Sequence, residues 1–167
     1  EDLSRGLGDV YKRQGNGFDI HKHSNDEKLV LGGISVEGPG FEAHSDGDIL
    51  LHSLSDALLG SKAKKDLGFY FPSDESTPKN ISSVEMLNKV LEIIEYDKVV
   101  INNIDITVLS QVINISKISE AIISNLADLL RIDKQLINVK GKSFDNLGLI
   151  GDGIASACIA LVSVKDA

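Results

Sequence analysis

Two short motifs contain the histidines and carboxylates with which this chain could hold a metal ion. Asp19 and His21 lie two residues apart in "GNGFDIH", whose alternation predicts a strand, so both side chains point to one face. His52 lies in mid-helix, with Asp48 and Asp56 one turn before and after it. If the helix packs beside the strand, Asp19, His21 and His52 form a three-ligand zinc site with an open fourth position, as in catalytic zinc. Asp48 or Asp56 would then orient the His52 ring.

Each of these motifs also has an ordinary explanation. A D-x-H pair usually belongs to a surface turn, and a histidine in mid-helix is more often packed or solvated than bound to a metal. The pattern does not place His44, and we expect His23 in "HKHSNDEK" to be exposed to solvent. The residue types alone therefore leave the metal site and these alternatives open.

The elements that must position these residues follow from hydrophobic periodicity. We predict a strand at 15–21 leaving a tight turn at two glycines, a hairpin partner at 28–36 and a loop at 37–43. A helix follows at 46–61, started by a Ser45–Asp48 capping box. The remaining elements are an irregular stretch at 62–80, a helix at 82–95, a strand at 98–111, a helix at 116–132 capped by Ser116 or Ser119, a strand at 135–143 and a last strand at 153–164, with a helix as the alternative. The order β-β-α-α-β-α-β-β indicates an α/β or α+β single domain.

Length and composition narrow the classes of function. The chain has 167 residues and a net charge of −8, which argues against general nucleic-acid binding. No apolar run reaches the ~18–20 residues of a membrane span, and no signal peptide is expected at the start. The one cysteine, Cys158, excludes an intramolecular disulfide and is expected in the core. We expect residues 1–12 to be a non-native or disordered leader and residues 13–167 to be one domain.

Five sequence blocks, in order and at the right separations, carry a resemblance to a known family. They are "GNGFDIH", "AHSDGDILLHSLSDALLGS", "KKDLGFYFP", "NIDITVLSQ" and "NVKGKS". Together they closely resemble the 2-C-methyl-D-erythritol 2,4-cyclodiphosphate synthase family of the non-mevalonate isoprenoid pathway, over about residues 13–164. The resemblance implies an α/β fold of the α+β sandwich type, with a mixed four-stranded-type sheet and helices on one face. It also implies a homotrimer with active sites between subunits, in the bacterial cytoplasm or a plastid-type compartment.

The resemblance assigns the first blocks to a metal and to one end of the substrate. Asp19, His21 and His52 match the ligands of Zn²⁺ (or Mn²⁺), which faces the terminal phosphate of a cytidine-diphosphate substrate. His44 and Ser45 match the residues that meet the 2-phosphate of the substrate, and they precede a helix whose free N–H groups favour an anion. The substrate-binding residues implied in the following block are Asp66, which holds hydroxyls of the methylerythritol moiety, Gly68 and Phe71.

The later blocks match the part of the family that binds the nucleotide. Residues 109–115 match a segment whose backbone cradles cytosine, and the substrate-binding residues implied there are Ser110, Val112, Ile113, Asn114 and Ile115. Lys142 and Ser143 match the phosphate-binding end of the next block. Asp145 matches a glutamate that holds Mg²⁺ between the two phosphates, a role that a shorter carboxylate still suits.

The implied reaction converts 4-diphosphocytidyl-2-C-methyl-D-erythritol 2-phosphate to the cyclic 2,4-diphosphate with release of CMP. The 2-phosphate attacks the β-phosphate, and the two metals neutralise the repulsion between the anions. Asp19, His21, His52 and Asp145 are the implied catalytic residues. No nucleophile motif stands in the sequence, in agreement with a substrate that supplies its own nucleophile. Neither nucleic acid nor a membrane is an expected partner.

Several positions depart from the family pattern and motivate other functions. Ser73 stands where an aspartate is usual, Ile113 and Asn114 replace a proline and a lysine, and "GLIGDGIA" (148–155) is two residues shorter and lacks the usual arginine and glutamate. The first alternative, motivated by the altered segment 143–153, is a non-catalytic trimeric protein of the same fold that binds a nucleotide or an isoprenoid diphosphate. The second is a zinc phosphohydrolase with a water molecule in the open metal position.

Overall fold

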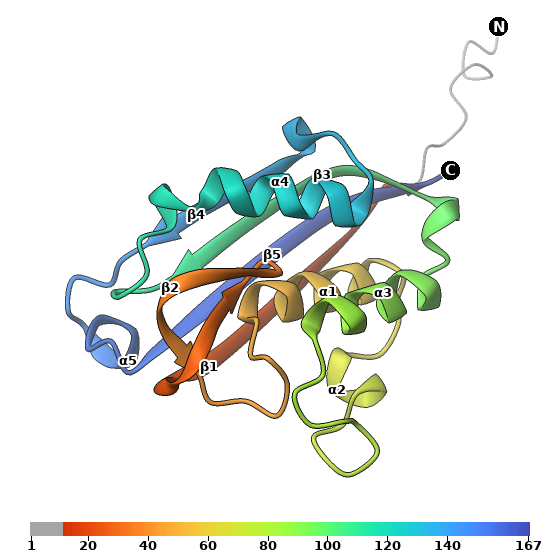
Figure 1. Cartoon of the computed structure of the whole chain (residues 1–167). Helices are drawn as coiled ribbons and strands as arrows, with labels where there is room; N and C mark the ends of the chain where they lie inside the picture. The colour runs from red at the N-terminus through yellow and green to blue at the C-terminus, as the bar shows by residue number, and fades with distance from the viewer. Residues whose placement is uncertain (1–11) are drawn as a thin grey trace, which may run out of the picture.

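A computed structural model describes residues 12–167, in which five strands form one mixed sheet in the order β2-β1-β5-β3-β4 (Figure 1). The strands are β1 (Lys12–Leu31), β2 (Ile34–Phe41), β3 (Val99–Leu109), β4 (Ile137–Lys142) and β5 (Ala155–Asp166). The β3–β4 pair is parallel and the other pairs are antiparallel. The mixed sheet is confirmed, but four strands is wrong, because β2 joins the sheet through the second half of the long β1. The leader expected at 1–12 lies outside the described residues except for Lys12, which begins β1.

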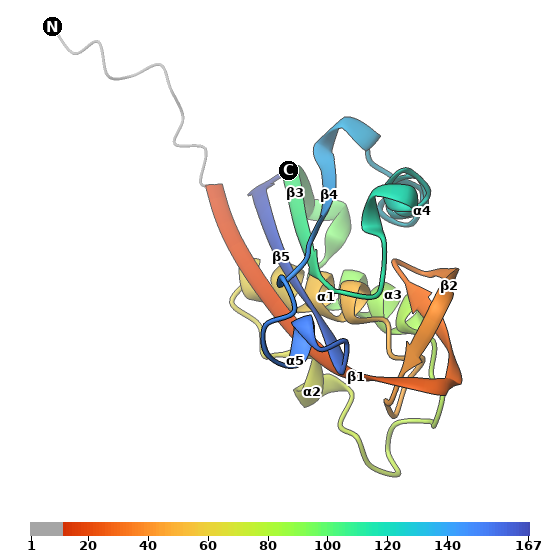
Figure 2. The ribbon, with the colours of Figure 1, turned by 90° about the vertical axis from the view of Figure 1, so that its left-hand side faces the viewer.

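Most of the helices that accompany this sheet lie on one side of it. The helices are α1 (Ile49–Ser61), α2 (Leu67–Tyr70), α3 (Ser83–Ile93), α4 (Ser119–Leu130) and α5 (Gly148–Gly151), with 3₁₀ turns at Tyr96–Lys98, Ile115–Lys117 and Lys134–Leu136. Helix α1 packs on β1 and β5, and α4 packs on β4. Figure 2 shows α1, α3 and α4 on the same side of the sheet, whereas Ile150 of α5 packs against Leu109, Ala155 and Ala157 on the other face. Across residues 12–167, no helix has the length and apolar character needed to cross a membrane.

Two glycines allow α1 to lie directly on β1. A Cβ atom on Gly17 would stand 1.9 Å from the carbonyl oxygen of Ser53, and one on Gly15 would stand 1.9 Å from that of Ala57. The tight turn predicted at these glycines is wrong, because both lie inside β1 and pair with β5. Their role is to permit close backbone contact. This contact places the side chains that follow in β1 beside the first turns of α1.

The buried carboxylate of Asp48 joins the hairpin to the start of α1. It accepts hydrogen bonds from the backbone N–H groups of Leu50 and Leu51 at 3.1 and 3.0 Å, and from those of Gly32 and Gly33 at 3.0 and 2.6 Å. The predicted Ser45–Asp48 capping box is therefore wrong, since Asp48 is itself the N-cap. Asp48 also occupies N–H groups that we expected to be free for a phosphate.

The hairpin and the remaining elements differ from the predictions at their ends. Gly32 and Gly33 have φ values of +63° and +77° and form the turn, so the predicted strand 28–36 is divided between β1 and β2. The loop predicted at 37–43 belongs to β2 as far as Phe41. The stretch 62–80 contains α2, and the helix predicted at 116–132 is shorter, with Ile118 at its N-cap in place of Ser116 or Ser119.

The C-terminal segment is a strand, so the alternative of a helix at 153–164 is wrong. Cys158 on this strand is fully buried, which confirms its predicted place in the core. Burial raises the pKa of its thiol above the ordinary value, to a degree that keeps it protonated. The core lies between the sheet and the helices and is built mainly from leucine, isoleucine and valine.

Candidate active site

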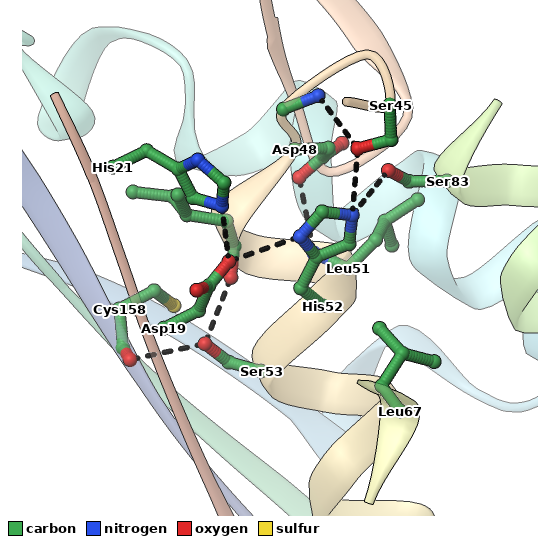
Figure 3. Close-up of polar contacts among 12 residues, drawn as sticks. Asp19, His21, Ser45, Asp48, Leu51, His52, Ser53, Leu67, Ser83 and Cys158 are labelled. Carbon is green, nitrogen blue, oxygen red and sulfur yellow. Dashed lines mark hydrogen bonds and ion pairs between the residues drawn. The ribbon is translucent and has the colours of Figure 1, made fainter. Parts of the chain in front are cut away.

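Asp19, His21 and His52 converge where β1 meets α1 (Figure 3). Nε2 of His21 lies 3.0 Å from Oδ2 of Asp19, and Nδ1 of His52 lies 2.9 Å from the same oxygen. One ligand atom from each residue lies within 4.8 Å of the other two, and all three residues are half-buried. The structure therefore brings together the three residues that the motifs proposed. Two imidazole nitrogens and a carboxylate oxygen are a ligand set that suits a zinc ion.

Hydrogen bonds on the outer side of each ring determine which nitrogen faces inward. Nδ1 of His21 donates to the carbonyl oxygen of Glu42 at 3.1 Å, so Nε2 faces Asp19. Nε2 of His52 lies 2.9 Å from Oγ of Ser83. The Ser83 hydroxyl donates to the carboxylate of Asp46, so its oxygen is the acceptor for His52. Each neutral ring can thus present an unprotonated nitrogen to a cation.

Ser83 and Asp46 are site residues that the sequence analysis missed. Asp46 also accepts a hydrogen bond from the backbone N–H of Ser83 at 2.8 Å, and Oγ of Ser45 lies 3.3 Å from Nε2 of His52. Ser83 lies in the first turn of α3, whose N-cap is Ser82. In the sequence, Ser83 therefore has the pattern of an ordinary helix start. Its contact with His52 joins residues 31 positions apart, and no local spacing reveals such a contact.

The electrostatics of the site favour an ionised carboxylate beside the two rings. Burial alone would raise the pKa of Asp19, but the hydrogen bonds and charges of His21 and His52 lower that pKa far below its ordinary value. Burial would lower the pKa of His21, but the hydrogen bond and charge of Asp19 outweigh it and raise that pKa. Protons and a metal cation therefore compete for the same inward-facing atoms.

A cavity of about 240 Å³ opens beside these three residues. It contains four residues that the resemblance assigned to substrate, namely His44, Ser45, Gly68 and Phe71. The rest of its wall beyond the metal ligands consists of Phe18, Ala43, Asp56, Leu67, Ser73, Thr77, Ile81 and Met86. Nε2 of His44 donates to the carbonyl oxygen of Thr77 at 2.9 Å, which fixes the orientation of its ring. The cavity is thus polar at the metal ligands and largely apolar on the remaining wall.

A second cavity of about 300 Å³ lies where β3 and β4 end. Its lining consists of residues 110–116 and 141–143 and includes seven residues that the resemblance assigned to substrate: Ser110, Val112, Ile113, Asn114, Ile115, Lys142 and Ser143. The two cavities have no lining residue in common. Within one chain, the implied substrate residues therefore form two separate groups.

Asp66 and Asp145 lie outside both cavities. Asp66 is exposed at the N-cap of α2, makes no capping bond with its side chain, and lines a smaller hollow beside Phe18 and Asp56. Asp145 is exposed in the loop after β4, in a left-handed backbone conformation with φ of +49°. We call the cavity beside Asp19, His21 and His52 the metal cavity. The structure places Asp66 next to it and leaves Asp145 apart from it.

Three other expectations about polar residues are corrected. Neither Asp48 nor Asp56 is hydrogen-bonded to His52, because both carboxylates bind backbone N–H groups instead. Asp56 accepts from the N–H of Leu67 at 2.7 Å and so fixes the start of α2. His23 is half-buried and not exposed, because its ring stacks on Phe41 with centroids 4.7 Å apart. Helical spacing gave the face of α1 correctly but not the direction of each carboxylate.

Comparison with known proteins gives the same family from sequence and from fold. Residues 12–165 match the model of the YgbB family. The chain is 38% identical over 156 residues to the 2-C-methyl-D-erythritol 2,4-cyclodiphosphate synthase of Fusobacterium nucleatum. The aligned region covers 92% of this chain and 98% of that protein. It matches the structure of IspF from Plasmodium falciparum in complex with CDP with a TM-score of 0.81 and 35% identity, over 95% of this chain and 99% of that one.

A longer protein shares the fold as well. The bifunctional IspDF from Campylobacter jejuni matches with a TM-score of 0.90 and 34% identity, over 99% of this chain and 46% of that one. The family match spans the three converging residues and both cavities. The chain belongs to the YgbB family.

Proposed function

We propose that this protein is a 2-C-methyl-D-erythritol 2,4-cyclodiphosphate synthase. It converts 4-diphosphocytidyl-2-C-methyl-D-erythritol 2-phosphate to the cyclic 2,4-diphosphate and releases CMP, in non-mevalonate isoprenoid biosynthesis. The observation that carries this conclusion is the group formed by Asp19, His21 and His52 at the wall of a cavity of about 240 Å³. Relatives of nearly equal length bear the name of this enzyme. Residues 13–167 would act as one catalytic domain, in the bacterial cytoplasm or a plastid-type compartment.

The residues present fit the two implied metals to different extents. Asp19, His21 and His52 fit Zn²⁺ or Mn²⁺, because their inward-facing atoms lie close together and their outer atoms are fixed by hydrogen bonds. Asp145 offers one exposed carboxylate, which suits Mg²⁺ if phosphate oxygens and water complete the octahedron. When bound, these ions would supply Lewis-acid chemistry and neutralise the repulsion between substrate phosphates.

The side chains around the metal cavity position the substrate and do not react with it. One oxygen of the 2-phosphate forms a bond to the β-phosphorus while the bond from that phosphorus to the bridging oxygen breaks, and the electron pair leaves on CMP. His44 and Ser45 would hold the 2-phosphate in line for this attack. Gly68, Phe71 and Asp66 would hold the methylerythritol moiety. Positioning and charge neutralisation are sufficient for such a transfer.

Two features support a homotrimer with active sites between subunits. The implied metal and nucleotide residues lie in separate cavities of one chain, so a complete site needs the nucleotide cavity of a neighbour. The sheet face opposite the helices also exposes a contiguous apolar group. Its members are Phe18 (55% exposed), Ile20 (44%), Ile159 (42%) and Leu161 (40%). Burial of this face between subunits would remove apolar surface from water and bring the cavities together.

The decisive experiment supplies the purified protein with 4-diphosphocytidyl-2-C-methyl-D-erythritol 2-phosphate, Zn²⁺ and Mg²⁺. We expect CMP and the cyclic diphosphate in equal amounts, measured by liquid chromatography and phosphorus NMR. A linear phosphate product would indicate the zinc phosphohydrolase instead. A metal-loaded trimer without turnover would indicate a binding protein of the same fold, the alternative that the altered segment 143–153 suggested.

A further inference from the structure

A chain of three polar side chains connects three strands beside the second cavity. Nε2 of His23 lies 2.8 Å from Oγ of Ser156, which lies 2.7 Å from Oγ of Ser110. His23 lies on β1, Ser156 lies on β5, and Ser110 directly follows β3. Ser156 is fully buried and Ser110 is 6% exposed, so these hydroxyls depend on each other for partners. None of the roles assigned above uses His23 or Ser156.

Both ends of this hydrogen-bonded chain of side chains meet backbone groups. Nδ1 of His23 lies 3.2 Å from the carbonyl oxygen of Gly40, while Nε2 of the same ring is hydrogen-bonded to the Ser156 hydroxyl. The Ser156 hydroxyl is in turn hydrogen-bonded to that of Ser110. At the far end, the oxygen of Ser110 accepts from two backbone donors, the N–H groups of Val112 and Ile113, at 3.3 and 3.0 Å.

The His23 end of this hydrogen-bonded chain of side chains is held firmly in place. The ring of His23 stacks on Phe41 with an interplanar angle of 25°, and its backbone N–H donates to the carbonyl oxygen of Ile154 at 2.9 Å. Its far end shapes the turn that begins the lining of the second cavity, where Ser110, Val112 and Ile113 all contribute. The hydrogen bonds therefore connect a fixed ring to the turn that lines the second cavity.

We propose that His23 and Ser156 are positioning residues for the nucleotide segment 110–115. By fixing the direction of the Ser110 hydroxyl, they hold the backbone of Val112 and Ile113 in the conformation that receives the cytidine base. The inference rests on the proposed function, which makes a cytidine nucleotide the ligand of this cavity. It adds two residues whose contribution to binding passes entirely through Ser110.

The test compares Ser156→Ala with Ser163→Ala. Both replace a serine on β5, but Ser163 is not part of the hydrogen-bonded group His23–Ser156–Ser110. We expect Ser156→Ala to raise the Kd for CDP about tenfold, because the buried Ser110 hydroxyl loses its side-chain hydrogen-bond partner. Its zinc affinity should stay unchanged, and the amide protons of Val112 and Ile113 should exchange faster in NMR. Ser163→Ala should alter none of these. His23→Phe keeps the stacking on Phe41 and should also weaken CDP binding.

The double variant His23→Phe/Ser156→Ala shows whether His23 and Ser156 act in series through Ser110 or make two independent contributions to CDP binding. If the residues act in series, it binds CDP no more weakly than Ser156→Ala alone. Additive losses, or unchanged amide exchange in Ser156→Ala, would overturn the inference. So would a Ser156→Ala variant that binds CDP as tightly as the wild type. A wild-type protein that binds no CDP would instead count against the proposed function.

Discussion

At the scale of single residues, His52 is a metal ligand whose two ring nitrogens both have polar side-chain partners. Nδ1 faces Asp19 and Nε2 faces Ser83. We predict that His52→Ala lowers zinc affinity by at least about 100-fold, because it removes one of three ligands. Product formation should fall with it, while the trimer persists. Zinc content after gel filtration and CMP release measure the two effects. A fully active, metal-free His52→Ala protein would refute the site.

The raised pKa of His21 predicts how zinc binding depends on pH. In the metal-free protein, pairing with Asp19 favours the protonated ring, so its stabilising effect is greatest at acidic pH and is lost as pH rises through the raised pKa. The same proton excludes a metal from Nε2. Zinc affinity should therefore fall as pH decreases from about 8 to about 5.5, by up to about tenfold per unit for one competing proton. Chelator competition at each pH measures this, and a flat profile would contradict it.

Asp145 should affect magnesium dependence more than the reaction itself. The residue is exposed and lies outside both cavities, so it can reach an ion only together with substrate phosphates and water. Asp145→Asn keeps one oxygen donor but removes the charge. We expect a several-fold higher magnesium concentration for half-maximal activity, with most of the activity recovered at saturating magnesium. An unchanged magnesium titration would count against this role.

At the scale of elements, local patterns predicted what depends on local interactions. Alternation and β-branched runs placed β3, β4, β5 and part of β1, and apolar spacing placed α1, α3 and α4. The turn at Gly32 and Gly33 was missed because "KLVLGGISV" is apolar on both sides of it. Contacts between distant residues had no local signal. The bond from Ser83 to His52 and the binding of Gly32 and Gly33 by Asp48 both depend on the completed fold.

The close packing of α1 on β1 makes opposite predictions for two glycines. Gly17→Ala would place a methyl group 1.9 Å from the Ser53 carbonyl oxygen, so α1 must move away from β1. We expect a loss of about 1–3 kcal/mol in the free energy of unfolding, and weaker zinc binding because His52 moves away from Asp19.

Gly60→Ala is the matched control for this prediction. Gly60 lies within α1, and a Cβ there would meet nothing closer than 3.8 Å. Better helix propensity should then stabilise the protein by up to about 1 kcal/mol. Urea unfolding of both variants measures the difference. Equal effects of the two substitutions would show that close contact is not the reason for glycine at position 17.

At the scale of the whole molecule, the division of the implied substrate residues between two cavities has a physical consequence. Residues of the metal cavity come from β1, the loop before α1, α1, the segment around α2 and α3, whereas those of the second cavity come from β4 and the segments that follow β3 and β4. No pattern within one chain shows that such groups complete each other across a boundary between subunits. The trimer was therefore expected from the resemblance alone, and what supports it here is the division between the two cavities together with the exposed apolar face.

The proposed assembly predicts that metal binding and activity can be separated. Ile159→Glu places a charge in the centre of the exposed apolar face, where Ile159 pairs with Phe18 on β1. Burial of an unpaired carboxylate between subunits is costly, so we expect the mass in sedimentation to fall from three chains to one chain of 18.0 kDa. The single chain should still bind zinc, because all three ligands are its own. Product formation should be lost with the trimer, since no neighbour supplies the nucleotide cavity.

Asn88→Glu adds the same charge to an exposed position on α3 and should change neither mass nor activity. A single-chain Ile159→Glu protein with full turnover would show that one chain holds a complete site.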